Sequence, residues 1–201
     1  MKLHIFLASP NGRKGVFVNA HTGLGAEVHE VSHQDGEHKS AAFLAMNPNG
    51  KIPVLELDDG SALWESNAVI NRMAGIAKSD LWPANDLRYE ILQWQFWESS
   101  HFQPACSRFI AKHVFGDDSV DIPAAEENFR RFAAVLDNAL AGRDWLVGEG
   151  MTTADVAVAS YLCYRERCAY PMDGYANIAR WLGVIEALPA WIEANPELKA
   201  G

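Results

Sequence analysis

The sequence predicts an α/β domain followed by an all-helical domain. Three observations support this fold class. Strand-like and helix-like segments alternate over residues 1–77, the segment 78–86 (KSDLWPAND) loses this periodicity, and every later pattern is helical. We therefore expect a first domain over 1–77, a linker over 78–86 and a second domain over 87–201.

The first domain is expected to run in the order β-α-β-α-β-β-α. Strands are predicted at 3–8 and 26–31, a hairpin at 52–64, and helices at 13–22, 40–46 and after Ser66. The first two strands need a crossover connection, whereas the last two are joined by a hairpin, so the sheet is expected to be mixed. This order of elements is that of the thioredoxin-like fold.

Residues 47–66, NPNGKIPVLELDDGSALWES, hold the most informative local pattern. Asn-Pro-Asn-Gly indicates a turn, and Pro53 then opens an apolar strand at a position where its missing N–H is tolerated. Asp59-Gly60 is typical of a tight hairpin. Ser66 stands where an amphipathic helix begins, and a hydroxyl there is a good N-cap.

The second domain is expected to consist of helices. They are predicted over 87–113 with a kink or break at Pro104, and over 123–141, 152–167, 175–187 and 189–194. Thr152 and Asp155 match a variant capping box, with Met151 and Val156 as its hydrophobic staple. Asp155 is therefore predicted to be structural, with a catalytic role as the alternative.

The formal net charge of −9 argues against nucleic acid as a partner. The charge is uneven. Residues 1–53 carry five Lys/Arg and four Asp/Glu, a net of +1, while the remaining 148 residues carry 12 and 22, a net of −10. A non-acidic first segment suits an anionic small ligand, and chance variation in surface charge is the alternative explanation.

The sequence predicts neither a membrane span nor a metal centre. No run of 18 apolar residues occurs, and no cluster has the spacing of metal ligands. The apolar start is too short for a signal peptide, so it is interpreted as a strand. Cys106, Cys163 and Cys168 form no C-x-x-C pair and support no disulfide framework, which favours a cytoplasmic protein.

The ordered set of an Asn-Pro turn, Ile52-Pro53, a hairpin and Glu65-Ser66 closely resembles the glutathione-binding half of the cytosolic glutathione transferase superfamily. With Ser9-Pro10-Asn11-Gly12, the chain is most similar to serine-type members, namely nu-class, Ure2p-like and related bacterial proteins. The resemblance covers nearly the whole chain. It implies a cis Ile52–Pro53 bond, with the Ile52 backbone left to pair with the cysteinyl part of glutathione.

The turn Ser9-Pro10-Asn11-Gly12 is the candidate catalytic site. N–H groups at a helix start favour an anion, which by the resemblance is glutathione thiolate. A hydrogen bond to a charged acceptor contributes roughly 1.5–3 kcal/mol, or about one to two pKa units for the thiol. Ser9 is expected to be the principal donor to the thiolate and Asn11 a supporting donor. On composition alone, this segment would be an ordinary helix-entry turn, and it holds no tyrosine or cysteine for the other mechanisms of the family.

The remaining glutathione contacts are expected from motif position in the family. They are His38, Lys51, Ile52, Pro53, Glu65 and Ser66. Glu65 would hold the γ-glutamyl ammonium, and the Ser66 hydroxyl and N–H the neighbouring α-carboxylate. Lys51 and His38 would pair with the glycine carboxylate, with solvated side chains as the alternative. Asn67 stands where many relatives carry arginine.

The pocket for the second substrate is expected between the domains, on the long helix after the linker. Its candidate residues are Trp97, His101 and Phe102, and a packed core stripe is the alternative. The resemblance also implies a homodimer that pairs the first domain of one subunit with the helical domain of the other. Residues 61–73 and 87–97 are the expected contributors.

The expected function is that of a glutathione transferase in detoxification, in which the thiolate attacks an apolar electrophilic molecule. A glutathione-dependent disulfide-bond reductase, peroxidase or isomerase of the same fold is the close alternative. A non-catalytic glutathione-binding or scaffold protein is a third possibility. The retained hydroxyl-amide turn and the Glu65-Ser66 pair argue against it, because a scaffold needs neither.

Overall fold

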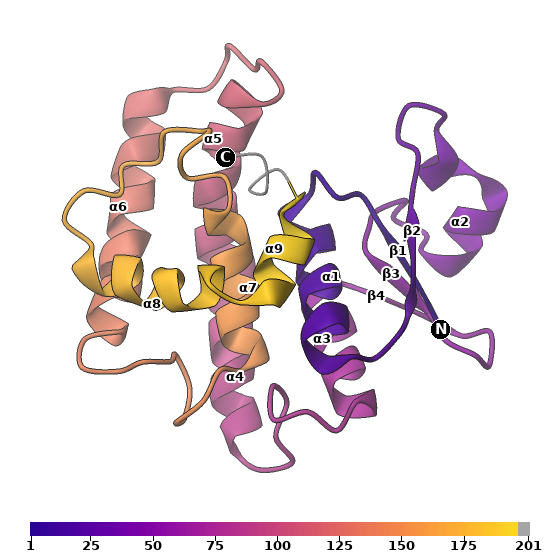
Figure 1. The fold of residues 1–201 in the computed structure, drawn as a ribbon. Coiled ribbons are helices and arrows are strands. Elements are labelled where there is room, and N and C mark those ends of the chain that lie inside the picture. Colours follow the sequence, from indigo (N-terminus) through magenta and orange to yellow (C-terminus); the bar gives the residue numbers. More distant parts are fainter. Residues whose placement is uncertain (197–201) are drawn as a thin grey trace. The chain divides into compact units, whose positions relative to one another are not determined.

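The computed structural model describes residues 1–196 and divides into two compact units (Figure 1). The first unit holds residues 1–83 together with the segment that begins at Leu188, and the second is Ala84–Ala187. The sequence-based division placed the C-terminal helix in the second domain. Its contacts group it with the first unit instead, because α9 (Pro189–Ala194) packs against α1 (Pro10–Thr22).

The first unit is built on a mixed four-stranded sheet, as expected. Its strands are β1 (Lys2–Ile5), β2 (Glu27–Glu30), β3 (Val54–Glu56) and β4 (Ala62–Trp64). Their order in the sheet is β2-β1-β3-β4, with β1 parallel to β2 and antiparallel to β3, and with β3 antiparallel to β4. This is the predicted thioredoxin-like arrangement. β2 lies at one edge, and three of its four residues are exposed.

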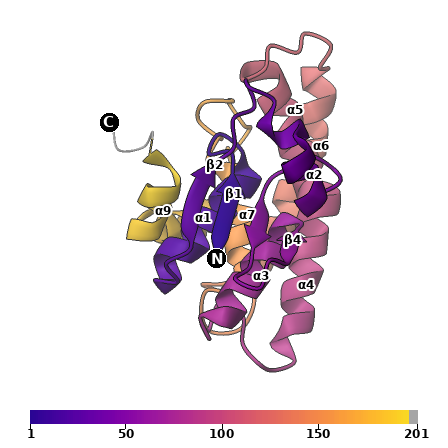
Figure 2. The same cartoon turned by 90° about the vertical axis from the view of Figure 1, so that its right-hand side faces the viewer.

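Helix α1 is central to the first unit, since it packs against β1, α3 (Ser66–Ile76) and α9 (Figure 2). It begins at Pro10, whose fixed φ and missing N–H suit the first helical position. Gly15 allows the close approach to the sheet, because a Cβ there would stand 2.9 Å from a methyl group of Leu3. The short helix α2 (Ala41–Met46) follows a 3₁₀ turn at Glu37–Lys39, and its start is capped by Ser40.

The second unit is helical. It contains α4 (Leu87–Trp97), α5 (Gln103–His113), α6 (Ile122–Ala139), α7 (Thr153–Leu162) and α8 (Ala176–Glu186). The break expected near Pro104 takes the form of a π turn at Glu98–Phe102, since proline has no N–H to bond to the preceding turn. All ten residues of α7 are buried, as expected for a helix at the centre of a bundle. Within residues 1–196, no helix combines the length and apolar character needed to cross a membrane.

The capping box at the start of α7 is confirmed. Asp155 Oδ2 accepts hydrogen bonds from the Thr152 backbone N–H at 2.8 Å and from the Thr152 hydroxyl at 3.2 Å. Its Oδ1 accepts from the Leu146 N–H at 3.0 Å and from Trp181 Nε1 at 2.9 Å. The carboxyl group is fully buried, and burial raises its pKa despite these donors. Asp155 therefore joins three segments of the second unit, in agreement with a structural role.

We predict that Asp155→Ala destabilises the protein more than Thr152→Ala does. Loss of the Thr152 cap is expected to cost about 0.5–2 kcal/mol. Loss of the Asp155 carboxylate also leaves the buried N–H groups of Leu146 and Trp181 without an acceptor, which costs about 1–3 kcal/mol for each group. We therefore expect Asp155→Ala to lower the free energy of unfolding by roughly 3 kcal/mol or more. Urea denaturation measures both free energies of unfolding. The exposed Asp173→Ala is the control, and equal stability of Asp155→Ala and this control would contradict the prediction.

Candidate functional site

The turn between β1 and α1 presents the Ser9 hydroxyl. The Ser9 carbonyl accepts from the N–H groups of Gly12 at 2.9 Å and Arg13 at 3.1 Å, so the serine begins the helix through its backbone. Its side chain makes no capping bond and has no hydrogen-bond partner within residues 1–196. The side chain is only partly buried. This hydroxyl is therefore available to donate a hydrogen bond to a bound molecule.

Gly12 fixes the path of this turn. A Cβ at position 12 would lie 2.6 Å from the Phe6 carbonyl oxygen, closer than real side chains approach. The same carbonyl accepts from the Ser9 N–H at 2.9 Å, which ends β1 earlier than the expected strand over 3–8. Glycine thus allows the first turn of α1 to fold back against the end of the strand.

Arg13 supports the turn from the C-terminal segment. Its guanidinium is buried, with Nε donating to the Leu7 carbonyl at 2.7 Å and Nη1 donating to Asn195 Oδ1 at 2.6 Å. Asn195 in turn donates through Nδ2 to the Trp191 carbonyl of α9 at 2.8 Å. Sequence reasoning missed this anchor, because nothing in the local pattern connects two residues 182 positions apart.

Lys14 joins the starts of α1 and α3. Its side chain is fully buried, and Nζ donates to Ser66 Oγ at 3.3 Å and to Asn67 Oδ1 at 3.2 Å. The Ser66 hydroxyl donates to Asn11 Oδ1 at 3.1 Å. The structure thus brings together Asn11 and Ser66, two predicted site residues 55 positions apart. Lys14 was not predicted, although its three-residue spacing from Asn11 on one helix gave a signal.

Glu65 enters α3 through an unusual backbone conformation. Its φ of 71° and ψ of 116° lie in a region that non-glycine residues rarely adopt. Such strain costs on the order of 1–3 kcal/mol and is concentrated at functional sites. The Glu65 side chain is exposed, and Ser66 follows as the first helical residue. The predicted carboxylate-hydroxyl pair therefore stands at a strained helix start.

The proline turn has the expected cis Ile52–Pro53 bond. Asn47 shapes the preceding loop, because its Nδ2 donates to the Lys51 carbonyl at 2.7 Å and its Oδ1 accepts from the Asn49 N–H at 3.1 Å. The Lys51 side chain is exposed and has no partner in the described part of the chain. Ile52 packs partly against the cluster of Val31, Phe43 and Val54.

His38 lies against this turn, since a Cβ on Gly50 would stand 3.1 Å from the His38 carbonyl. Its ring stacks on His33 with centroids 4.5 Å apart, and His33 in turn packs on Phe6 at 4.4 Å. Desolvation, followed by the positive potential of His33 and Lys39, lowers the pKa of His38. The imidazole is thus mostly neutral at pH 7. Its buried Nδ1 has no hydrogen-bond partner among residues 1–196, so any role toward a carboxylate is that of a neutral donor.

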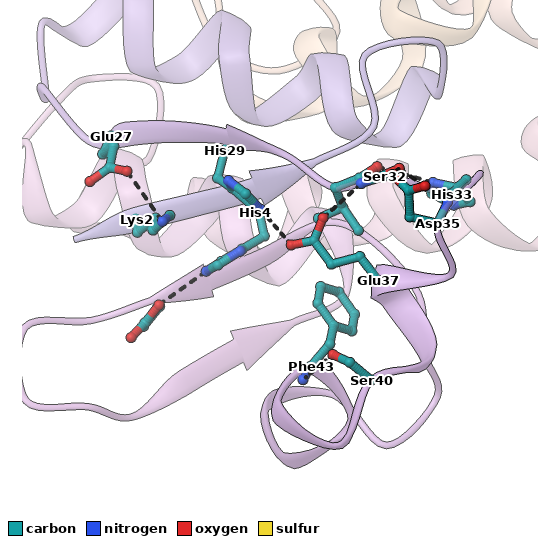
Figure 3. A network of polar contacts seen from close by, with 12 residues as sticks. Lys2, His4, Glu27, His29, Ser32, His33, Asp35, Glu37, Ser40 and Phe43 are labelled. Carbon is teal, nitrogen blue, oxygen red and sulfur yellow. Dashed lines mark hydrogen bonds and ion pairs between the residues drawn. The ribbon is translucent and has the colours of Figure 1, made fainter.

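Two histidine–carboxylate pairs lie on this sheet, and the pair of His29 and Glu37 joins β2 to the segment that carries His38 (Figure 3). His29 Nε2 lies 2.6 Å from Glu37 Oε1, and Glu37 Oε2 accepts from the Ser32 N–H at 2.8 Å. The hydrogen bond to His29 lowers the pKa of Glu37. On the same sheet, His4 Nε2 lies 3.0 Å from Glu56 Oε2. No three His, Cys, Asp or Glu side chains within residues 1–196 are arranged to hold a metal ion.

The expected pocket residues of the second unit have different surroundings. Phe102 is 0 % exposed and packs against Trp97 at 5.3 Å and Phe129 at 5.8 Å, which makes it a core residue instead of a lining residue. His101 is exposed and stacks on Phe132 with centroids 5.2 Å apart. Trp97 is partly buried, between Phe102 and Phe132. Phe102 is therefore part of the core, which was the alternative to a pocket, whereas the side chains of Trp97 and His101 are at least partly exposed.

Comparison with known proteins assigns the family. The model for the glutathione S-transferase N-terminal domain matches residues 8–74, and that for the C-terminal domain matches residues 101–189. Glutathione S-transferase 3 of Zea mays is 30% identical over 207 residues, which cover 95% of this chain and 91% of that protein. This chain belongs to the glutathione S-transferase family. The first match spans the turn of Ser9, the proline turn and the start of α3.

Other members of the family show similar coverage. A glutathione S-transferase of Hyoscyamus muticus is 28% identical over 96% of this chain and 97% of that protein. The crystal structure of a glutathione S-transferase from Pseudomonas fluorescens has a TM-score of 0.84 at 30% identity, covering 94% of this chain and 96% of that one. A Pseudomonas putida glutathione transferase, solved with one glutathione disulfide bound per subunit, has a TM-score of 0.85 at 25% identity, covering 96% of this chain and 90% of that one.

The chain is also similar to part of a longer protein. Elongation factor 1-gamma 3 of Oryza sativa subsp. japonica is 30% identical over 169 residues, which cover 81% of this chain and 40% of that protein. Relatives of this chain thus include proteins of about its own length and longer proteins in which the similar region is only a part.

We predict that Asn195→Ala destabilises the first unit. The substitution removes the buried hydrogen bond to the Arg13 guanidinium, and a hydrogen bond to a charged group contributes about 1.5–3 kcal/mol. Urea denaturation measures the loss. Gln34→Ala, at an exposed position, is the control and is expected to stay within about 0.5 kcal/mol of wild type. Equal stability of the two variants would show that Asn195 is not an anchor.

Proposed function

We propose that this chain is a glutathione transferase that binds glutathione across the starts of α1 and α3 and activates its thiol at Ser9. The hydrogen bond from Ser66 to Asn11 carries this proposal, because it brings two helix N-termini into one site. Each helix N-terminus carries a partial positive charge, and the buried ammonium of Lys14 adds to it. The site is therefore suited to a ligand with negative charge at both positions, as glutathione has in its thiolate and its α-carboxylate.

Each of the three residues of glutathione is assigned to a different part of the site. The α-carboxylate of the γ-glutamyl residue binds the backbone N–H groups at the start of α3, among them that of Ser66, because the Ser66 hydroxyl proton is already donated to Asn11. The exposed Glu65 carboxylate holds the neighbouring ammonium. The Ile52 backbone, next to Pro53, pairs with the cysteinyl residue. The unpartnered Lys51 ammonium and the neutral His38 ring bind the glycine carboxylate.

In the proposed mechanism the Ser9 hydroxyl donates to the glutathione sulfur. A thiol with a pKa near 8.5 is only a few per cent ionised at pH 7, and one charged hydrogen bond of roughly 1.5–3 kcal/mol lowers that pKa by about one to two units. The proton leaves to solvent. The thiolate then attacks an apolar electrophile, so that a carbon–sulfur bond forms and the leaving group departs with its electron pair.

A glutathione-dependent disulfide reductase is the second candidate. The observation that favours it is the glutathione disulfide bound in the similar Pseudomonas putida transferase. In that reaction the thiolate attacks a disulfide sulfur and releases a thiolate. A panel of electrophile, peroxide and disulfide substrates with glutathione distinguishes the two activities. A scaffold role, as in a portion of a longer protein, predicts no turnover with any of them.

We predict that Ser9→Ala lowers kcat at pH 7 by about tenfold or more, with a smaller effect on glutathione binding, since the thiolate loses its principal hydrogen bond. Ser9→Thr keeps a hydroxyl and is expected to retain more activity. Ser61→Ala, on the exposed hairpin, is the control. Steady-state kinetics and calorimetric titration with glutathione measure the two effects. Unchanged turnover in both Ser9→Ala and Asn11→Ala would disprove the thiolate assignment.

We also propose a homodimer that uses α4. Two large apolar side chains on this helix, Tyr89 and Phe96, are 74% and 67% exposed and lie seven residues apart, hence on the same face. Exposed aromatic residues of this kind are enriched at protein interfaces.

Light scattering at micromolar concentration is predicted to give twice the 22.2 kDa mass of the chain. Tyr89→Ser combined with Phe96→Ser is expected to shift the protein toward the monomer, because the interface loses its aromatic anchors. Phe115→Ser removes an equally exposed aromatic residue elsewhere in the second unit and is the control. A wild-type mass near 22.2 kDa at full activity would contradict the dimer.

A further inference from the structure

Lys14 determines the direction of the hydrogen bonds around it. An ammonium group has three donors and no acceptor, so Ser66 Oγ and Asn67 Oδ1, two of the atoms that it contacts, must accept. A serine hydroxyl has one proton. Because Ser66 Oγ accepts a hydrogen bond from Lys14, its own O–H is directed to the second neighbour and donates to Asn11 Oδ1 at 3.1 Å.

The same reasoning fixes the orientation of the Asn11 side chain. An amide group accepts only through its oxygen and donates only through its nitrogen. Since Asn11 Oδ1 accepts from Ser66, Nδ2 lies on the other branch of the amide as a donor. Within residues 1–196 this Nδ2 makes no hydrogen bond, and Asn11 is only partly buried in the first turn of α1.

We propose that Lys14 is a positioning residue that sets a one-way relay, Lys14 to Ser66 to Asn11, and so keeps the Asn11 amide N–H directed to the glutathione sulfur. This inference rests on the proposed function, because the acceptor at the end of the relay is the thiolate. The buried ammonium also polarises the Ser66 O–H, and successive hydrogen bonds of this kind strengthen one another. Lys14 therefore favours the ionised thiol without touching it.

The relay also joins the two ends of the glutathione site. Ser66 is the residue assigned to the α-carboxylate, and Asn11 stands beside the residue assigned to the sulfur. Asn67 supplies a further acceptor that holds the Lys14 ammonium in place. A change at Lys14 should thus alter the ionisation of the bound thiol and not only the affinity for the tripeptide.

The test is the pKa of glutathione bound at saturation, read from the ultraviolet absorbance of the thiolate as a function of pH. Lys14→Met is expected to raise that pKa by about half to one unit, which from a wild-type value of about 6.5–7.5 is roughly a 1.5- to 8-fold loss of thiolate at pH 7. kcat at pH 7 is expected to fall by the same factor and to recover at pH 9. Lys14→Arg also keeps a donor-only cation and is expected to restore most of the shift.

A double-mutant cycle separates a relay from a general effect of charge. Ser66→Ala leaves the buried lysine in place and should raise the thiol pKa similarly, while Lys14→Met in the Ser66→Ala background should add little, because both act through one path. Lys2→Met, which removes a lysine paired with Glu27 on the surface, is the charge-matched control and should not shift the pKa.

Three outcomes would overturn the relay. A thiol pKa that is unchanged in Ser66→Ala overturns it even where Lys14→Met does not fold. If the thiol pKa shifts of Lys14→Met and Ser66→Ala are fully additive, the ammonium acts through its electrostatic field and not through a chain of hydrogen bonds. Absence of any bound thiolate in the wild-type protein would overturn the proposed function together with the relay, whereas a wild-type thiolate that is insensitive to both substitutions overturns the relay alone.

Discussion

The first unit depends on two consecutive buried cations of α1. A buried charge is costly unless it is hydrogen-bonded, so Arg13 and Lys14 constrain every group that surrounds them. Arg13 fixes the Leu7 carbonyl and, through Asn195, the C-terminal helix. Lys14 fixes the start of α3. The turn that carries Ser9 is thereby held from two sides by buried cations whose hydrogen bonds tie it to the C-terminal segment and to the start of α3.

Features encoded by short spacing could be predicted from the sequence. The capping box of Thr152 and Asp155 and the hairpin are each specified by residues within a few positions of one another, and each is present. Asn11 and Ser66 were each expected in the site from the resemblance, but the hydrogen bond between them was not predicted. The cis Ile52–Pro53 bond, which the resemblance implies, is also present. The structure thus agrees with the sequence where local geometry and local chemistry determine the outcome.

Other features depend on tertiary packing, and the sequence could not supply them. The bond between Arg13 and Asn195 spans 182 positions, so α9 was assigned to the wrong side of the expected boundary. Phe102 shares its helical spacing with Trp97 and His101, and periodicity does not distinguish a core ring from an exposed one. His38 was expected to pair with a carboxylate, and its lowered pKa, caused by desolvation and then by His33 and Lys39, could not be inferred from the local pattern. For Arg13 and Phe102 the deciding group comes from another part of the fold.

The edge strand β2 has a further consequence, which concerns self-association. An open sheet leaves unpaired N–H and C=O groups along its outer strand, and such an edge is a template for joining other chains. β2 has only four residues, and it begins and ends with the exposed glutamates Glu27 and Glu30. Two sheets that met edge to edge would bring like charges together, so the strand repels its own copies while it completes the sheet.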